Sequence, residues 1–337
     1  MMEESRLIVS ASPHIKDKDT IPRIMWTVVA SLLPAIIAGT YFFGLRVLLL
    51  VLVSSASAVA TEAIIQKATH KLFGKKLEQK GFKGAPPPCK RIAVSDGSAV
   101  VTGVLLAMVI PPGVPLWMPV IGAFCSIAFA KAPFGGLGYN IFNPALIGRA
   151  ILLASFPVAM TTWNLPIPLQ TVDSVTGATP LELIKQGNLE HLPSIWNLFI
   201  GMSGGSAGET SELAILIGAA VLLVRGYITW HIPISFVCTV AGVVGLQQLF
   251  GDQNFIMIPF HIFSGGLFLG AFFMATDMVT SPLTKKGGVI FGIGAGMITC
   301  VIRILGGYPE GVCYSILLMN AFTPLIDRYV KPRRLGR

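Results

Sequence analysis

The sequence predicts an all-α protein that crosses a membrane repeatedly, with about ten transmembrane helices. Charged residues make up 12% of the 337 residues and apolar residues 53%, whereas a soluble domain carries about 25% charged residues. Apolar blocks recur along the chain, each close to the roughly 20 residues that cross about 30 Å of hydrocarbon. The short alternating segments of a membrane β-barrel are missing from the sequence.

Ten apolar blocks are the predicted spans, and polar or glycine-rich segments separate them. Proline and glycine inside a span, such as Pro34 and Gly242, are tolerated because neighbouring helices satisfy the backbone groups that they free. The five tryptophans fall near span ends or in the long polar loop, as in an aromatic belt. The predicted spans are residues 24–43, 45–65, 96–112, 115–131, 144–160, 211–225, 229–249, 258–275, 287–303 and 310–326.

The distribution of basic residues predicts the orientation of these spans. If the termini lie in the cytoplasm, all but three of the 25 basic residues, including Arg149, lie on the cytoplasmic side, as the positive-inside rule requires. The three exceptions are Arg46, Lys185 and Arg303. The net charge of +9 then reflects membrane orientation and lipid contact, and it indicates no nucleic-acid partner.

This topology divides the chain into five predicted segments. A long polar loop lies between the fifth and sixth spans and faces outward. The segments are a cytoplasmic segment 1–23, a first five-span half 24–160, the outer loop 161–210, a second five-span half 211–326 and a basic tail 327–337.

Two series of motifs, five spans apart, suggest an internal repeat. An odd offset turns one half upside down relative to the other, an arrangement that is common in transporters. We therefore expect two inverted five-helix repeats. The first series is Pro111-Pro112, Gly135-Gly136 and Asn143-Pro144, and the second is Ser281-Pro282, Gly306-Gly307 and Asn320 to Pro324.

Two kinds of cofactor site lack a recognisable motif. The five cysteines form no CxxC pair and no Cys/His grouping, so the chain offers no self-contained iron–sulfur or zinc site. No Gly-x-Gly-x-x-Gly motif follows a soluble strand, so no nicotinamide site is predicted. Any electrons must therefore arrive from partner proteins.

The outer loop contains the most informative motif, Asp173-Ser174-Val175-Thr176-Gly177-Ala178-Thr179-Pro180. One interpretation is a polar turn that caps a short helix beginning at Pro180. The other is a modification site, in which the small residues Thr176, Gly177 and Ala178 leave the backbone accessible and the Thr179 hydroxyl accepts a group. Asp173 would orient a metal or a hydroxyl during the transfer. The two interpretations are compatible.

This motif resembles the flavinylation signature of the RnfD/NqrB family of respiratory ion-pump subunits. The resemblance implies that FMN is attached to Thr179 through a phosphoester bond by an extracytoplasmic flavin transferase. Three further segments resemble the same family, with Met278 where proline is frequent. They are Gly135 to Ala145, Gly204 to Ser211 and Phe273 to Pro282.

The resemblance implies a membrane subunit of the Rnf complex, which couples electron transfer between ferredoxin and NAD⁺ to Na⁺ or H⁺ transport. The chain is then part of a translocase in the bacterial inner membrane and not an enzyme alone. Its partners would be RnfA, RnfB, RnfC, RnfE and RnfG, with the flavoprotein RnfG as the nearest electron partner.

A second, non-covalent flavin is also implied, namely riboflavin near the cytoplasmic side. Asn140 and Asn143 are candidates to bind it because carboxamides three residues apart share a face on a helical turn. Their alternative role is to satisfy the backbone of a broken helix. Gly204 and Gly205 are candidates to hold the FMN phosphate through backbone amides, or they form a flexible segment capped by Thr210 or Ser211.

Carboxylates near membrane depth are candidates for an ion path. Asp96 and Asp277 are the principal ones, and Glu62 is a third. Asp96 stands next to the start of a span, so helix capping is an alternative role. For Asp277, the oxygens of Thr276 and Thr280 would help to bind a cation.

Three other functions remain open. The chain could be an NqrB-like subunit of a Na⁺-translocating NADH:quinone reductase. It could also be a channel or transporter without a redox role, which the repeat alone would allow, or an assembly anchor.

Overall fold

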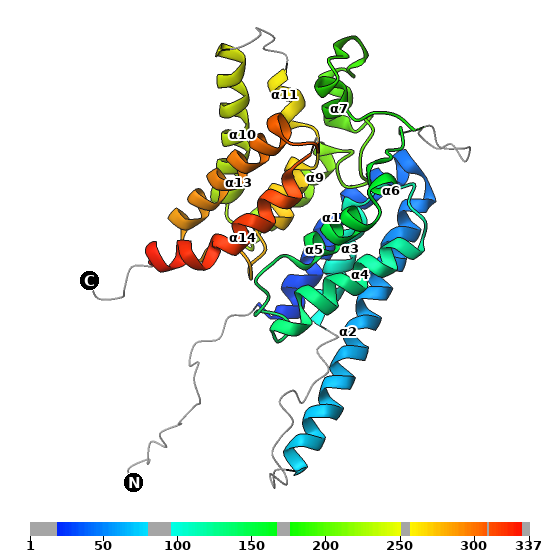
Figure 1. Ribbon diagram of the computed structural model, residues 1–337, viewed down its shortest axis with the longest axis vertical. Coiled ribbons are helices and arrows are strands. Elements are labelled where there is room, and N and C mark those ends of the chain that lie inside the picture. The colour runs from blue at the N-terminus through cyan, green and yellow to red at the C-terminus, as the bar shows by residue number, and fades with distance from the viewer. Residues whose placement is uncertain (1–18, 80–95, 167–175, 251–256, 309, 332–337) are drawn as a thin grey trace, which may run out of the picture.

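The computed structural model describes residues 19–79, 96–166, 176–250, 257–308 and 310–331, and these are mainly helical (Figure 1). Within these ranges the only β-type pairing is a single bridge between Asn164 and Thr176. The expectation of an all-α fold is therefore confirmed.

Helices lie at each of the ten predicted positions. Five are long and apolar enough to cross a membrane, three apolar ones are shorter, and the count of ten spans stays a prediction. The main helices are α1 (Ile21–Phe43), α2 (Leu45–Gln79), α3 (Ser98–Val109), α4 (Trp117–Ala130), α5 (Pro144–Ser155), α9 (Glu212–Val224), α10 (His231–Phe250), α13 (Lys285–Leu305) and α14 (Val312–Tyr329). The shorter elements are η2 (Ala132–Phe134), α6 (Pro157–Thr161), α7 (Pro180–Lys185), η3 (Leu189–His191), α8 (Ile195–Ile200), α11 (Met257–Ile262), α12 (Leu267–Leu269) and the π-helical turn η4 (Gly270–Met274).

The short helices have identifiable ends. α3 has 12 residues, which at 1.5 Å per residue is about 18 Å and too short to cross the hydrocarbon core alone. It stops before Pro111-Pro112, because proline supplies no backbone N–H. Pro157 likewise separates α5 from α6.

The eighth predicted span is broken, which corrects the expected continuous helix over 258–275. α11 ends at Ile262, and the chain resumes as α12 and η4. Gly265 and Gly266 form the break with φ of 73° and 65°, a conformation that suits glycine because it lacks Cβ. Arg303 holds the break by donating to the carbonyl oxygens of His261 and Ser264.

The helices form two groups that pack against each other (Figure 1). α1 to α5 make up one group and α10, α13 and α14 the other, with α9 between them and in contact with α1. At this contact Gly218 lies against the backbone of Ser31, where a Cβ atom would come within 1.9 Å of the Ser31 carbonyl oxygen. Only a glycine therefore permits the observed approach.

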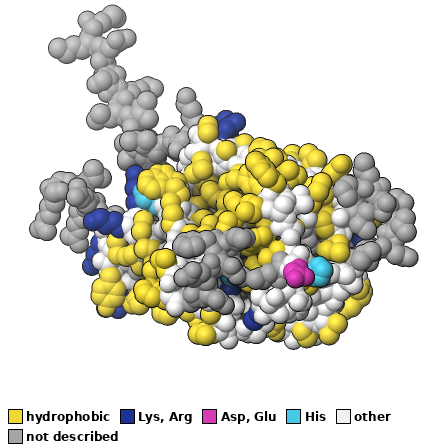
Figure 2. Space-filling model, turned by 90° about the horizontal axis from the view of Figure 1, so that it is seen from above, with side chains coloured by type: hydrophobic (Ala, Val, Ile, Leu, Met, Phe, Trp, Pro, Cys, Tyr) yellow, Lys and Arg dark blue, Asp and Glu magenta, His cyan; other side chains and the backbone are white. Residues whose placement is uncertain are grey.

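Large apolar side chains cover much of the surface, as Figure 2 shows for one end of the molecule. Val224 and Phe250 are 88% and 90% exposed. Exposed apolar area of this extent in a folded protein indicates contact with lipid or with other subunits. Together with the five long apolar helices, this surface indicates a multi-pass membrane protein.

Two features bear on the expected repeat. Lys131 follows α4 and donates to Ser98 at the start of α3, while Arg303 near the end of α13 binds the carbonyls just before α12. These parallel contacts agree with a match between α3–α4 and α12–α13. The match of Asn143 to Asn320 was wrong, because Asn143 is the N-cap of α5 whereas Asn320 lies inside α14.

Candidate functional site

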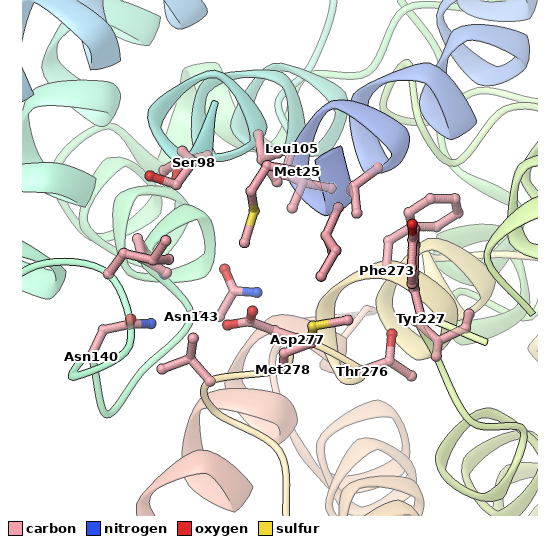
Figure 3. A pocket seen from close by; sticks show the side chains of 18 of the residues that line it. Met25, Ser98, Leu105, Asn140, Asn143, Tyr227, Phe273, Thr276, Asp277 and Met278 are labelled. Carbon is pink, nitrogen blue, oxygen red and sulfur yellow. The ribbon is translucent and has the colours of Figure 1, made fainter. Parts of the chain in front are cut away.

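The first candidate site is a pocket between the two helix groups, which we call the Asn140 pocket (Figure 3). Its walls are mostly apolar and carry a few polar groups, the usual composition of a small-molecule site. η4 contributes Phe272 and Phe273, and π-helical turns are frequent at functional sites. The polar groups that line the pocket are Ser98, Thr102, Lys131, Asn140, Asn143, Tyr227, Thr276 and Asp277.

Asn143 is a structural hub as well as a lining residue. Its side-chain oxygen accepts from the backbone N–H groups of Ala145 and Leu146, and its amide donates to the Met274 carbonyl. Its backbone N–H donates to the amide oxygen of Asn320 at 3.1 Å, in the orientation that satisfies both ends of that side chain. Asn143 therefore caps α5 and joins it to η4 and α14.

Asn140 has more hydrogen-bonding capacity left for a ligand. Its amide donates to the Phe142 carbonyl at 3.2 Å, which leaves the side-chain oxygen available to accept. The spacing of the two carboxamides led us to expect that they share a helical turn, and this was wrong, because α5 begins only at Pro144. The chain between them is irregular, yet it brings both side chains to one pocket.

A buried ion pair borders this pocket. The Lys131 ammonium lies 2.8 Å from the Glu62 carboxylate and donates to the Ser98 hydroxyl at 2.6 Å. Gln66 donates to the same carboxylate at 3.2 Å. Glu62, a candidate for the ion path, is therefore paired with Lys131, a residue whose role the sequence did not reveal.

The other two ion-path candidates have different surroundings. Asp96 accepts from the backbone N–H and the hydroxyl of Ser98, the first residue of α3; the N-cap residue itself is Gly97, so Asp96 supports the start of the helix from one position earlier than a cap. Asp277 lines the Asn140 pocket, and the Thr280 hydroxyl donates to it at 3.2 Å. Removal from water raises the pKa of the Asp277 carboxyl, while the Thr280 bond and the Lys131 charge oppose the rise.

The second candidate site is a small pocket that contains Thr179, which we call the Thr179 pocket. Thr179 is the N-cap of α7, and its hydroxyl accepts from the Glu182 N–H at 3.2 Å. Gly204 lines the same pocket with Ser203 and Ser264. The expected helix from Pro180 and the expected closeness of Gly204 to Thr179 are both observed.

The rest of the motif is held by the chain that precedes it. Thr176 pairs with Asn164, and the Gly177 N–H donates to the Trp163 carbonyl. A Cβ atom on Gly204 would lie 3.8 Å from the Ala178 carbonyl oxygen, so Ala178 also borders the pocket. Gly205 instead faces Glu209, and Asp173 lies outside the described residues.

Three charged side chains meet beside the Thr179 pocket. Arg149 pairs with Glu209 at 3.5 Å and with Glu310, and both glutamates line the pocket. The sequence placed Arg149 at the end of the molecule opposite Thr179, and this was wrong, because Arg149 lies inside α5 and reaches the Thr179 end. A charged residue within an apolar span is a functional signal that could have singled it out.

The two pockets lie at opposite ends of α3. Ser98, the first residue of α3, lines the Asn140 pocket. Near the other end, the Met108 carbonyl accepts from the N–H of Gly208, next to Glu209 of the Thr179 pocket. Ten residues of helix span about 15 Å. The molecule thus holds two candidate ligand sites, one toward each end.

Comparison with known proteins gives matches along almost the whole chain. Residues 8–336 match the NQR2, RnfD, RnfE family. Over 97% of this chain and 96% of the relative, the sequence is 44% identical to the D subunit of the proton-translocating ferredoxin:NAD(+) oxidoreductase complex of Clostridium ljungdahlii. It is 48% identical, over 99% and 97%, to the D subunit of the Na(+)-translocating ferredoxin:NAD(+) oxidoreductase complex of Acetobacterium woodii. A third relative, the D subunit of an ion-translocating oxidoreductase complex of Stutzerimonas stutzeri, is 41% identical over 95% and 93%.

Proposed function

Because the chain belongs to the NQR2, RnfD, RnfE family, we propose that it is the D subunit of an ion-translocating ferredoxin:NAD⁺ oxidoreductase complex. It carries FMN on Thr179, holds riboflavin in the Asn140 pocket and relays electrons between RnfG and other Rnf subunits. The observation that carries this function is the position of Thr179 inside a pocket with Gly204, at the opposite end of α3 from a second pocket.

The Thr179 pocket fits a phosphoester. Gly204 presents backbone without a side chain to the pocket, where an added Cβ would already contact the Leu165 side chain at 3.4 Å. Ser203 and Ser264 offer hydroxyl donors to a phosphate, while the charge of Arg149 offsets part of the negative charge of Glu209 and Glu310, which also line the pocket. Thr179 is only 6% exposed, so a group attached there would occupy the pocket and not hang free in water.

The Asn140 pocket fits a flat ring system with a polar edge. Phe272, Phe273 and Leu105 supply apolar faces. Asn140 supplies both a donor and an acceptor, whereas Asn143 has most of its capacity committed to α5 and η4. We therefore assign the ligand contact to Asn140 and the positioning of the pocket wall to Asn143.

In this function, flavins supply electron transfer and the chain supplies position. Thr179 and Gly204 hold one group at one end, and Asn140 orients the other. Asn143 joins the two helix groups through Met274 and Asn320. Coupling to ion movement requires that the redox states favour different conformations, and these contacts between groups are where such a preference would act.

We further propose that the molecule spans the bacterial inner membrane ten times as two inverted repeats, with the Thr179 pocket outside and both termini in the cytoplasm. The positions of Arg46, Lys185 and Arg303, the three basic residues that we expected on the outer side of the membrane, support this orientation. Lys185 donates to the Gly306 carbonyl close to Arg303, and Arg46 donates to Gly113, next to Asn164 of the attachment loop. All three thus lie toward the Thr179 end.

In-gel fluorescence tests the attachment. The chain is co-expressed with a flavin transferase, denatured and examined under ultraviolet light, and the wild-type band should fluoresce. Thr179→Val should abolish the signal, because valine preserves the shape but lacks the acceptor hydroxyl. Thr162→Val is the matched control, since Thr162 is an exposed threonine whose hydroxyl donates to the nearby Val158 carbonyl.

Equal fluorescence of Thr179→Val and the control would exclude Thr179 as the attachment site. A wild-type chain that never fluoresces, although it assembles with its partners, would remove the covalent flavin from the function altogether.

The family also includes NQR2, so a role in an NADH:quinone reductase is the second candidate. The electron acceptor separates the two functions. Reduction of NAD⁺ by ferredoxin in the purified complex supports the first, and quinone reduction by NADH supports the second. Flux without any flavin would instead support a channel or transporter.

A further inference from the structure

The Thr179 end contains five buried or half-buried charged side chains, which we call the glutamate–arginine cluster. The cluster brings together α5, α9, α13 and the segments before α9 and α14. Its members are Arg149, Glu209, Glu212, Arg303 and Glu310.

Two of the three carboxylates are paired with an arginine. Arg149 contacts both Glu209 and Glu310. Arg303 gives its donors to the backbone carbonyls of His261, Ser264 and Glu310. The cluster therefore sets two guanidinium charges against three carboxyl groups, and full ionisation would leave one excess negative charge.

Glu212 is the carboxyl group without a partner. Its residue is fully buried, and neither of its oxygens has a hydrogen-bond partner among the described residues. An ionised carboxylate in such surroundings is disfavoured far more strongly than the neutral acid. The charged side chains of Glu209 and Arg303 lie nearby.

The helix terminus does not reverse this balance. Glu212 lies in the first turn of α9, where a negative charge is favourable. However, Ser211 already accepts from the Ala214 N–H at that terminus, and the Glu212 oxygens make no bond to the described backbone there. A general dipole effect is weaker than the loss of all solvation and hydrogen bonding.

We propose that the glutamate–arginine cluster is a proton-binding site, in which Glu212 carries one proton at neutral pH. The proton makes the cluster electrically neutral. No redox step is involved: a carboxylate oxygen of Glu212 accepts a proton from H₃O⁺, which leaves H₂O, and the acid returns that proton to water as H₃O⁺.

The Thr179 pocket provides the connection between this site and water. Glu209, which lies three residues before Glu212, lines that pocket together with Glu310 and Ser264. The Ser264 hydroxyl is buried and has no hydrogen-bond partner among the residues that the structure describes. It therefore keeps its donor and acceptor capacity at the wall that the pocket shares with Glu209 and Glu310.

The proton site has its role only within the proposed ion-translocating function, but its existence does not depend on the flavin. Negative charge added in the Thr179 pocket would strengthen proton binding to the cluster, and removal of that charge would weaken it. The site could thus link the charge state of a group on Thr179 to proton uptake at the same end of the molecule.

Infrared spectroscopy of the intact complex in lipid vesicles tests the site. At neutral pH the wild type should show the carbonyl stretch of a protonated glutamic acid, and the band should shift in D₂O because the pocket allows exchange. Glu212→Gln should remove this one band. Glu182→Gln is the matched control, because Glu182 lies nearby on α7 and is only partly buried, and the band should persist.

Glu209→Gln gives a second reading if Glu212→Gln does not assemble. Removing the Glu209 charge lowers the proton affinity of Glu212, so the band should disappear at a lower pH than in the wild type. The site is refuted if the band survives in Glu212→Gln, or if Glu209→Gln leaves its titration unchanged. Because the band is measured on protein with or without flavin, these results are distinct from the fluorescence test of Thr179.

Discussion

Lys131 and Glu62 at the Asn140 end form one buried pair whose charges cancel, whereas two arginines at the Thr179 end face three carboxyl groups. At the first site every polar atom of Lys131 and Glu62 is directed to a partner, with Ser98 and Gln66 completing the set. At the second, Glu212 and one oxygen of Glu310 lack a partner within the described residues.

The difference indicates two kinds of buried charge. A balanced pair resists change, because removing either partner leaves an uncompensated charge. A cluster with one carboxyl group too many can adjust its charge by binding or losing a proton. We therefore expect the Lys131–Glu62 pair to hold the structure together and the glutamate–arginine cluster to respond to its surroundings.

The largest effect is expected from Lys131→Met. This change leaves Glu62 buried without its counter-charge, which typically costs about 3–5 kcal/mol. The free energy of unfolding, measured in mixed detergent micelles, should fall by this order. A double variant with Glu62→Gln should recover much of the loss, and a cost that the second change does not reduce would contradict a role for the pair.

Arg149→Met should be less damaging and should depend on pH. It leaves Glu209 and Glu310 without their guanidinium group, but these carboxyl groups can take up a proton. Burial already raises the pKa of Glu310, which lies in the loop before α14. An acid with a raised pKa in the folded state contributes stability below its unfolded pKa, and this stability is lost as the pH rises.

The cost of Arg149→Met should therefore be largest at neutral pH and should shrink as the pH falls toward about 5, by an amount on the order of 1 kcal/mol per unit of pH. Thermal unfolding of the variant and the wild type across this range measures it. If the loss of stability in Arg149→Met does not depend on pH, the cluster does not adjust its charge, and it then does not differ in this respect from the Lys131–Glu62 pair.

A smaller pH effect is expected from Asp277→Asn. Because the folded pKa of Asp277 is raised, its ionisation destabilises the folded state as the pH increases from the ordinary aspartate range. The wild type should lose stability relative to Asp277→Asn over that range, and thermal unfolding at several pH values measures the difference. Parallel profiles for the two proteins would show that Asp277 remains fully solvated.

The smallest effect is expected at Asp96. Asp96→Ala removes the bonds to Ser98 at the start of α3, and loss of a side-chain bond to the first turn of a helix costs about 1 kcal/mol. Asp96→Asn should retain most of that stability, since the asparagine side-chain oxygen can accept the same bonds. Ion transport in vesicles separates the two roles: if Asp96→Asn transports normally, its carboxylate supports the start of α3, and a severe loss of transport would place it in an ion path.

The positions of the helices were predictable from the apolar blocks, because the side chains of each block contact lipid or the protein interior. The breaks were harder to predict. The eighth span read as one helix, yet Gly265 and Gly266 interrupt it where Arg303 supplies donors for the freed carbonyls. Arg303 lies 38 residues from Gly265 in the sequence. The residues around the break therefore do not indicate which group will donate to its carbonyls.

The two sites show the same limit. The motif around Thr179 predicted the capped helix, because that feature concerns a short stretch of chain. The glutamate–arginine cluster was not predicted, because Arg149 lies 60 residues from Glu209 and 161 residues from Glu310 in the sequence. Charge counting placed Arg149 in the cytoplasm, because that count considers loops and not partners.

Asn143 has a consequence for how the protein could be divided. Its contacts to Met274 and Asn320 connect segments that lie on opposite sides of the long loop in the sequence. A chain cut within residues 161–210 would keep these contacts, together with the approach of Gly218 to Ser31. The two fragments, produced as separate polypeptides, would therefore carry complementary surfaces by which each half recognises the other.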